Sequence, residues 1–329
     1  MRAVVLGIGA VGVRAARQLA SSVEVSDLVL CDRSASRAVA AAGEIGPMAT
    51  AAPWPVHGVP DCDALVIAAP VELELVKRAL TAGASVISVA DAIADVKTLL
   101  GLDRLARSAG TVLVIGAGVA PGLTDVLARH AGRGLDVIEE IHVAKAGTAG
   151  PACARQHHRA LTEEALDWRD GTWVRRAGGS GRELCWFPDP VGGRDCYRAG
   201  LSDALLLVPA FPGVRRVTAR VAATRRDRLT SPLPMLRRPH PEGEIGAVRV
   251  EVRGLSQGAR SDRILGVVAR PGAAAGAVAA VSALWAVGGR FRRTGAGGLG
   301  ALLTEPAPFL VELARRGVSP EAFEGTPGL

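Results

Sequence analysis

The glycine-rich segment that follows the first apolar run constrains the fold of this chain more than any other feature. Residues 3–6 are typical of a buried strand, and Gly7-Ile8-Gly9-Ala10-Val11-Gly12 follows them directly and opens a helical pattern. A GxGxxG motif in that position is typical of dinucleotide-binding domains. The first glycine permits a tight turn, the second lets backbone amides approach a pyrophosphate, and the third lets the helix pack on its strand. We therefore expect this segment to bind phosphates at the helix N-terminus through Gly7, Gly9, Ala10, Val11 and Gly12.

An acidic and a basic residue stand side by side at the end of the second apolar run. Asp32 follows residues 28–31, at the point where an acid can bind the ribose 2′-hydroxyl of NAD. Asp32 would repel a 2′-phosphate, whereas Arg33 can pair with that phosphate or stack on the adenine. The two residues therefore predict a nicotinamide dinucleotide. They leave NAD and NADP both open, with Asp32 favouring NAD.

Apolar runs alternate with helical patterns as far as residue 125. The runs cover residues 3–6, 28–31, 64–68, 86–89 and 111–115, and the helical patterns cover about 11–21, 35–43, 72–82 and 93–109. Strands that are apolar along their whole length are covered on both faces, as in a parallel, doubly wound sheet. This pattern predicts an α/β fold with a dinucleotide-binding Rossmann domain over residues 1–125.

Three further segments follow strands at the carboxyl edge of this expected sheet, where ligands bind in open α/β folds. Ala69 and Pro70 follow the third run and let a dinucleotide lie close to the backbone. Asp91 follows the fourth run, where it can either face the site or cap the next helix. Gly118 and Pro121 precede a helix whose N-terminal amides can hold a ribose or a carboxylate. All five residues are therefore candidates for the cofactor site.

The pattern changes after Pro121. Residues 214–223 and 247–253 alternate polar and apolar side chains, which is typical of a mixed or antiparallel sheet with one wet face. Residues 147–212 suggest a long irregular segment, and such segments are usually functional or disordered. We therefore predict a second, α+β domain on a mixed sheet over residues 126–272, for substrate binding, catalysis and dimerisation. Helices over residues 273–329 are expected to pack back on the Rossmann domain.

The composition argues against several other classes of protein. The chain has 329 residues, a net charge of +7 and five cysteines. Its arginines lie in separate pairs without interleaved aromatic residues, so we expect no nucleic-acid binding. The cysteines form no CxxC pair and have no histidines at zinc spacing, so we expect neither a disulfide framework nor a metal site.

Membrane insertion and export are not expected either. The small apolar segment 273–289 falls short of the roughly 20 residues that span a bilayer. A strand that starts at residue 2 leaves no room for a signal peptide. We therefore expect a cytoplasmic protein that is not inserted in a membrane.

The order of these motifs resembles the saccharopine dehydrogenase and saccharopine reductase family. The resemblance rests on GxGxxG, an acid followed by Arg, Ala-Ala-Pro, Val-x-Asp, and Gly-x-Gly-x-x-Pro-Gly-Leu-x-Asp over residues 116–125. It is good over residues 1–131 and loose beyond them, although residues 277–313 are similar to the returning helices of that family. The resemblance implies a nicotinamide cofactor that reduces an imine formed between an amine and an oxo acid, or oxidises the secondary amine back.

Three residues of the middle segment are candidates for proton transfer. His157 is of the type most readily poised near pH 7, Lys145 can lose its proton when desolvated, and Tyr197 can donate one. Each has a structural alternative, namely a solvated or interface helix for His157, the surface for Lys145 and packing for Tyr197. Arginines can bind a substrate carboxylate through bidentate hydrogen bonds. The candidates for that role are Arg155, Arg159, Arg182 and Arg198.

The motifs and the resemblance together predict an NAD(P)-dependent oxidoreductase. We expect hydride transfer at the C–N bond of a small imine, amine or amino-acid-like substrate, in a homodimer. One alternative is a dehydrogenase of a carbonyl or semialdehyde, which would need no amine to turn over. The other is a dinucleotide-binding protein that lacks catalysis.

Overall fold

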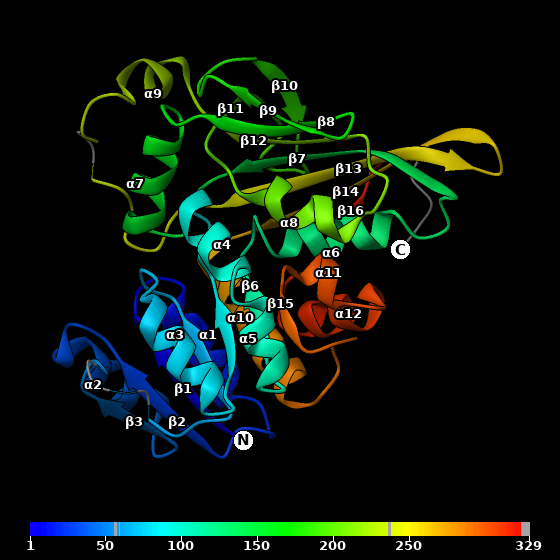
Figure 1. Cartoon of the computed structure of the whole chain (residues 1–329). Helices are drawn as coiled ribbons and strands as arrows, with labels where there is room; N and C mark the ends of the chain where they lie inside the picture. Colours follow the sequence, from blue (N-terminus) through cyan, green and yellow to red (C-terminus); the bar gives the residue numbers. More distant parts are fainter. Residues whose placement is uncertain (56–57, 59, 236–237, 324–329) are drawn as a thin grey trace.

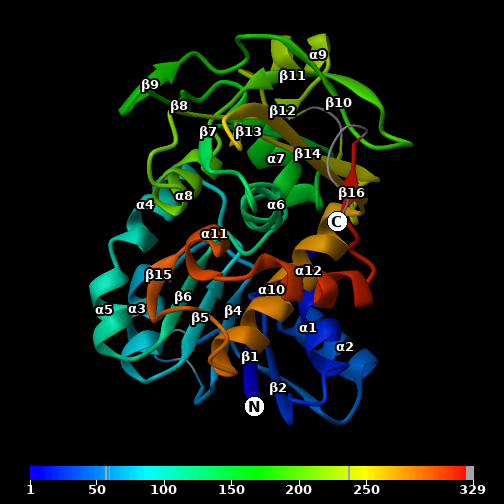
Figure 2. The same cartoon turned by 90° about the vertical axis from the view of Figure 1, so that its right-hand side faces the viewer.

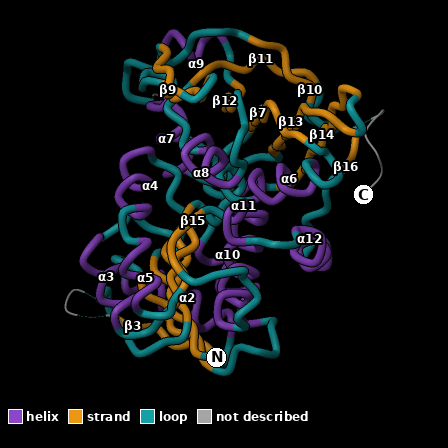
Figure 3. The backbone as a smooth tube through the Cα atoms, turned by 45° about the vertical axis from the view of Figure 1, so that its right-hand side comes forward, coloured by secondary structure: helices purple, strands orange, loops and turns teal. Residues whose placement is uncertain are grey.

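Two sheets organise the chain, one in the lower half and one in the upper half of Figure 1. The structure is a computed structural model and describes residues 1–55, 58, 60–235 and 238–323. The last six residues of the expected C-terminal region, 324–329, lie outside the described residues. Figure 3 shows how helices lie beside and between the two sheets.

The first sheet is parallel throughout, with the order β15-β6-β5-β4-β1-β2-β3 in the described part of the chain. Strands β1, β4, β5 and β6 are buried along most of their length, as their continuous Val, Ile and Leu content predicts. The predicted doubly wound α/β fold is therefore confirmed. The strands are β1 (Arg2–Leu6), β2 (Asp27–Cys31), β3 (Ala49–Ala52), β4 (Ala64–Ile67), β5 (Ser85–Ser88), β6 (Val112–Ile115) and β15 (Gly295–Gly297).

Helices connect these strands and cover the sheet. One helix was expected over residues 93–109, but the chain forms two, because it turns between Leu100 and Asp103. The helices are α1 (Gly12–Ala20), α2 (Ala35–Ile45), α3 (Leu73–Thr81), α4 (Ile93–Leu100), α5 (Asp103–Ser108) and α6 (Leu123–Ala131).

The second sheet is mixed, as the alternating pattern predicted. Its strands follow the order β10-β11-β12-β7-β13-β14-β16 within the described residues, and β8 and β9 extend it beside β12. Strands β7 and β12 are parallel, and their other neighbours are antiparallel. The strands are β7 (Val137–Ala146), β8 (Ala165–Arg169), β9 (Thr172–Arg176), β10 (Glu183–Trp186), β11 (Gly193–Arg198), β12 (Arg216–Ala222), β13 (Gly246–Ser256), β14 (Ala259–Ala269) and β16 (Glu321–Ala322).

The expectation of a long irregular segment over residues 147–212 is wrong. This segment forms the helix α7 (Pro151–Ala160), strands β8 to β11 and the helix α8 (Asp203–Ala210), and α9 (Arg225–Thr230) follows β12. The strands are short and carry Arg, Trp and Cys rather than alternating aliphatic residues, so the sequence gives little strand signal.

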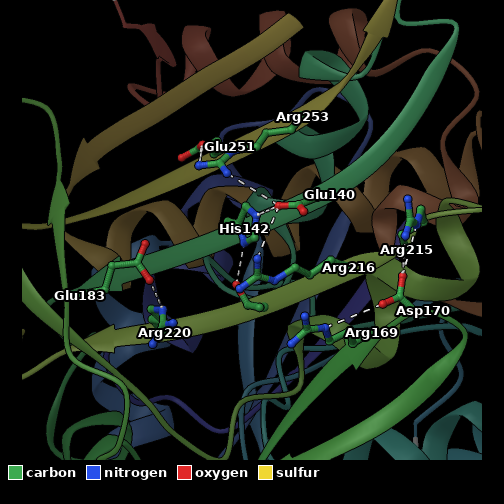
Figure 4. Close-up of polar contacts among 11 residues, drawn as sticks. Glu140, His142, Arg169, Asp170, Glu183, Arg215, Arg216, Arg220, Glu251 and Arg253 are labelled. Atoms are coloured by element: carbon green, nitrogen blue, oxygen red, sulfur yellow. Dashed lines mark hydrogen bonds and ion pairs between the residues drawn. The ribbon is translucent and has the colours of Figure 1, made fainter. Parts of the chain in front are cut away.

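Side-chain alternation gives the second sheet two different faces. Ile141, Val143 and Lys145 of β7 share the face that packs toward the helices and the first domain. His142 points to the other face, where its ring nitrogens lie 2.8 Å from Glu140 Oε2 and from Thr218 Oγ1. Figure 4 shows the ion pairs among arginines and glutamates on that face. Lys145 is thus directed away from the charged face.

The C-terminal segment returns to the first sheet. Figure 2 shows α10 (Pro271–Val287) beside α1, and the structure contains direct contacts between them and with β4 and β5. Helix α10 is apolar all round, which is typical of a helix buried on every side. After α10 come β15, which pairs with β6, then α11 (Leu299–Leu302) and α12 (Pro306–Arg315). In the described part of the chain, no helix combines the length and the apolar character of a membrane span.

Candidate active site

A cavity of about 900 Å³ lies between the carboxyl edge of the first sheet and the second sheet. The first sheet contributes the loops that follow β1, β4, β5 and β6. The second contributes the end of β7, helix α7 and parts of β13 and β14. Residues of the lining that the argument uses are Gly9, Ala10, Val11, Arg37, Ala69, Pro70, Asp91, Gly118, Pro121, Lys145, Cys153, Arg155, His157 and Arg159.

The three glycines of the loop after β1 have the surroundings that the motif predicts. Gly7 has a φ of +88°, and a Cβ on it would lie 2.6 Å from Ala68 O. A Cβ on Gly12 would collide with Gly7 O, because α1 starts directly against that turn. A Cβ on Gly9, in contrast, would meet no atom within 4 Å, so the loop leaves space on its cavity side. This shape fits a pyrophosphate held by the first amides of α1, for which the N-cap Val11 offers no side-chain acceptor.

Asp32 and Arg33 lie beside the cavity and are absent from its lining. The carboxylate of Asp32 accepts hydrogen bonds from the N–H of Ile8 at 2.7 Å and of Ser34 at 2.8 Å. Arg37 Nη1 lies 3.2 Å and 3.3 Å from its two oxygens. The guanidinium of Arg33 lies over the ring of Trp54, 5.4 Å from the centroid, and 3.7 Å from Glu72.

Lys145, Asp91 and His157 meet inside the cavity, although they come from three different elements. Lys145, at 5% exposure, donates a hydrogen bond to Ala120 O at 3.0 Å. Asp91 Oδ2 lies 4.0 Å from Lys145 Nζ and 3.9 Å from His157 Nε2. Asp91 does not cap the next helix, because α4 starts after Ala92 with no side-chain capping bond. The alternatives of a surface lysine and a helix-capping aspartate therefore do not describe these residues.

Burial shifts the pKa values of His157 and Asp91. It lowers the pKa of His157 well below the ordinary value, and the nearby Lys145 charge lowers it further. Burial also raises the pKa of Asp91, against the opposite influence of Lys145. His157 is therefore neutral at pH 7, and its Nδ1 has no hydrogen-bond partner among the described residues. The neighbouring His158 points elsewhere and bonds Leu233 O.

The sequence interpretation missed Cys153 and Arg37. Cys153 Sγ lies 3.6 Å from His157 Nε2, one turn earlier on α7. The i, i+4 spacing after a helix-starting proline was the available signal. Burial raises the pKa of Cys153, so the group stays a thiol rather than a nucleophilic thiolate.

Two arginines of α7 line the cavity with free guanidinium groups. Arg155 and Arg159 are spaced i, i+4, which puts both on one side of the helix. Neither guanidinium has an ion-pair or hydrogen-bond partner in the part of the chain that the structure describes. The remaining candidates lie outside the cavity lining. Tyr197 is buried in the core, Arg198 pairs with Asp167 at 3.0 Å, and Arg182 pairs with Asp195 at 2.8 Å.

The parallel doubly wound sheet, with a mixed sheet beside it and a cavity between the two, defines a Rossmann-type α/β fold. Saccharopine dehydrogenase (L-Glu forming) from Saccharomyces cerevisiae matches 98% of this chain and 99% of its own, with a TM-score of 0.71 and 13% identity. The chain therefore has the fold of saccharopine dehydrogenase, as the order of motifs predicted.

Two further structures match over most of their length with lower scores. A myo-inositol dehydrogenase from Corynebacterium glutamicum matches 100% of this chain and 99% of its own, with 13% identity and a TM-score of 0.49. GenD2 from gentamicin A biosynthesis, in complex with NAD, matches 98% and 96%, with 14% identity and a TM-score of 0.47. No family model and no curated protein matches the sequence.

Proposed function

We propose that this chain is an NAD(P)-dependent oxidoreductase that acts at the C–N bond of an amino-acid-like imine or secondary amine. One observation carries the proposal: a single cavity contains both the glycine loop and the buried group of Lys145, Asp91 and His157. The first can hold a dinucleotide, and the second can hold and move a proton. A bound nicotinamide supplies or accepts the hydride.

The residues present fit such a cofactor. Gly9 leaves open space beside the N-terminus of α1, where amides and the helix dipole favour phosphates. Ala69 and Pro70 after β4 and Gly118 after β6 offer small side chains along the expected path of the dinucleotide. Together they leave the carboxyl edge of the sheet accessible to a flat ligand.

Lys145 is the residue that we expect to transfer the proton to or from the substrate nitrogen. Its ammonium group has three N–H donors, and Ala120 O accepts one of them. The other two are available to a substrate nitrogen or oxygen. Asp91 stabilises the positive charge of Lys145. His157 is neutral and adds no further positive charge, and its ring nitrogens can accept or donate a hydrogen bond. Burial in the cavity limits water, which would hydrolyse an imine.

Arg155 and Arg159 are suited to bind an anionic substrate. A guanidinium binds a carboxylate with two parallel hydrogen bonds, and these two have no competing partner among the described residues. A carboxylate held by these arginines would lie along the part of the cavity wall that α7 forms. In this proposal, Arg155 and Arg159 bind the substrate carboxylate, and Lys145 transfers the proton.

Titration with NADH and NADPH, followed by nicotinamide fluorescence, tests the proposal first. Gly9→Asp places a carboxylate where we expect the pyrophosphate and should abolish binding. Gly43→Asp is the matched control, since Gly43 also has open space but lies on α2 outside the cavity. Loss of binding in Gly9→Asp alone supports the proposal, and failure of the native chain to bind either cofactor refutes it.

A screen of amines with oxo acids then defines the bond. Turnover that needs an amine supports action at a C–N bond. Turnover of a carbonyl or semialdehyde without an amine would favour the alternative dehydrogenase, for which Lys145 can equally protonate an oxygen. Cofactor binding with no turnover of any substrate, unchanged by Lys145→Ala, would favour a protein without catalysis.

The homodimer expected from the sequence stays a prediction. Strand β10 lies at the edge of the second sheet and exposes Leu184 and Trp186 by 57% and 62%. An edge strand with exposed apolar residues is suited to contact another chain. Light scattering of the native chain, beside Trp186→Glu, tests this expectation.

A further inference from the structure

We propose that Arg37 reads the 2′-phosphate of the cofactor and makes the chain prefer NADPH to NADH. The inference rests on the proposed function, because it concerns the same dinucleotide site. It departs from the sequence expectation, in which Asp32 favours NAD and Arg33 is the residue that can meet the phosphate.

The carboxylate of Asp32 is already occupied by the protein. A carboxylate has about four acceptor positions, two on each oxygen. Oδ1 receives the N–H of Ser34 and Arg37 Nη1, and Oδ2 receives the N–H of Ile8 and the same Nη1. Asp32 is 7% exposed and is absent from the cavity lining. It therefore organises the glycine loop and the start of α2, with little capacity left to bind a ribose hydroxyl.

Arg37, unlike Asp32, is exposed and has unused hydrogen-bond donors in the described part of the chain. Its side chain is 58% exposed and lines the cavity, and only Nη1 is used, by Asp32, among the described residues. The guanidinium carries five N–H donors in a fork that fits phosphate oxygens. Arg37 thus offers free donors at the end of β2, where the adenosine ribose lies in this fold.

The surroundings of Arg37 favour an anion. It is the third residue of α2, whose first turn contains no acidic side chain. The hydroxyls of Ser34 and Ser36 lie 3.0 Å apart at the same exposed helix start and can donate to a phosphate. Asp32 opposes a phosphate by its charge, but Arg37 and two amides already compensate that charge.

Arg33 is held elsewhere. Its guanidinium stacks on Trp54 and faces Glu72, which also accepts a hydrogen bond from Trp54 Nε1 at 3.1 Å. Arg33 and Trp54 thus form a flat surface on which an adenine ring can stack. The structure therefore assigns the phosphate to Arg37 and the base to Arg33.

The experiment measures the dissociation constants of NADPH and NADH for the native chain and for Arg37→Gln. The native chain should bind NADPH about tenfold more tightly or better, and Arg37→Gln should weaken NADPH by about tenfold or more while NADH changes less than about threefold. Arg17→Gln is the matched control, because Arg17 is also exposed and ion-paired but lies on α1 outside the cavity lining.

Competition by 2′-AMP and 5′-AMP gives a second readout that needs no nicotinamide contact. The native chain should prefer 2′-AMP, and Arg37→Gln should lose that preference. A native chain that binds NADH as tightly as NADPH, or an Arg37→Gln variant that keeps the NADPH preference, overturns the inference and leaves the proposed function intact. Binding of no dinucleotide at all overturns both.

Discussion

Lys145 offers a direct test of the chemistry at the scale of one residue. Lys145→Arg keeps a positive charge beside Asp91 but replaces an ammonium group, which can donate a proton, with a guanidinium that stays protonated in proteins. We expect kcat to fall by about 10²- to 10⁴-fold, the usual contribution of a positioned acid or base, with unchanged dissociation constants for NADH and NADPH. Lys97→Arg, at an exposed lysine of α4, is the control. A kcat close to that of the native chain would show that another group moves the proton.

Asp125 tests the electrostatics of the buried interior. Burial raises the pKa of this carboxyl well above its ordinary value, and the nearby Asp203 raises it further. The folded chain then binds a proton that the unfolded chain releases above about pH 4, so the free energy of unfolding falls as pH rises toward the raised pKa. Asp125→Asn should therefore be more stable than the native chain at pH 8, by about 1–3 kcal/mol, and closer to it at pH 5.

Urea unfolding at pH 5 and pH 8 measures this difference. Asp262→Asn, which removes an exposed carboxyl, is the control. An Asp125→Asn variant that is less stable than the native chain at pH 8 would mean that the carboxylate has stabilising interactions in its charged form, and would contradict the prediction.

Side-chain direction decided which candidate residues meet at the site, and a single sequence shows it only in part. Lys145 shares a face of β7 with Ile141 and Val143, an alternation that is visible in the sequence. Tyr197 also lies on the helix-covered face of its sheet, but farther from the cavity, and the short polar strand β11 gave no pattern by which to place it. Residue type thus made Lys145 and His157 candidates, and the tertiary arrangement brings these two to the cavity while Tyr197 lies outside its lining.

Helix α7 is the element that we propose binds the substrate carboxylate. Its Arg155 and Arg159 line the cavity and are exposed. Removing both charges should therefore leave the fold intact and weaken the binding of a carboxylate substrate. We expect the variant Arg155→Gln/Arg159→Gln to raise KM by about 10- to 100-fold, the loss of one or two charge-assisted contacts, with little change in cofactor affinity. Arg226→Gln on the exposed helix α9 is the control. An unchanged KM would remove α7 from substrate binding.

The elements that the sequence predicted well are those with a strong periodic pattern. Strands β1, β4, β5 and β6 are rich in Val, Ile and Leu, and their burial makes the pattern continuous. Strands β3 and β15 consist of Ala, Thr and Gly, residues of low or mixed strand preference, and only their neighbours in the sheet make them strands. Tertiary pairing therefore supplied what local preference did not.

At the scale of the whole molecule, the first sheet depends on the C-terminal segment. Helix α10 is buried along nearly all its length and contacts α1, β4 and β5, and β15 completes the edge beside β6. A fragment of residues 1–125 should therefore lack cooperative thermal unfolding, while addition of a fragment of residues 271–329 should restore it. Circular dichroism during heating measures both. Cooperative unfolding of the fragment 1–125 alone would show that it is an independent domain.

The pairing of β15 with β6 also sets an order of events during translation. A ribosome releases β6 long before β15, because strands β7 to β14 of the second sheet are encoded between them. During this time the edge of β6 has no β15 to pair with, and the apolar surface that α10 covers in the finished fold is exposed. Such surfaces are prone to aggregation, so the yield of soluble protein should depend on elongation rate and on chaperones more than the stability of the finished fold would suggest.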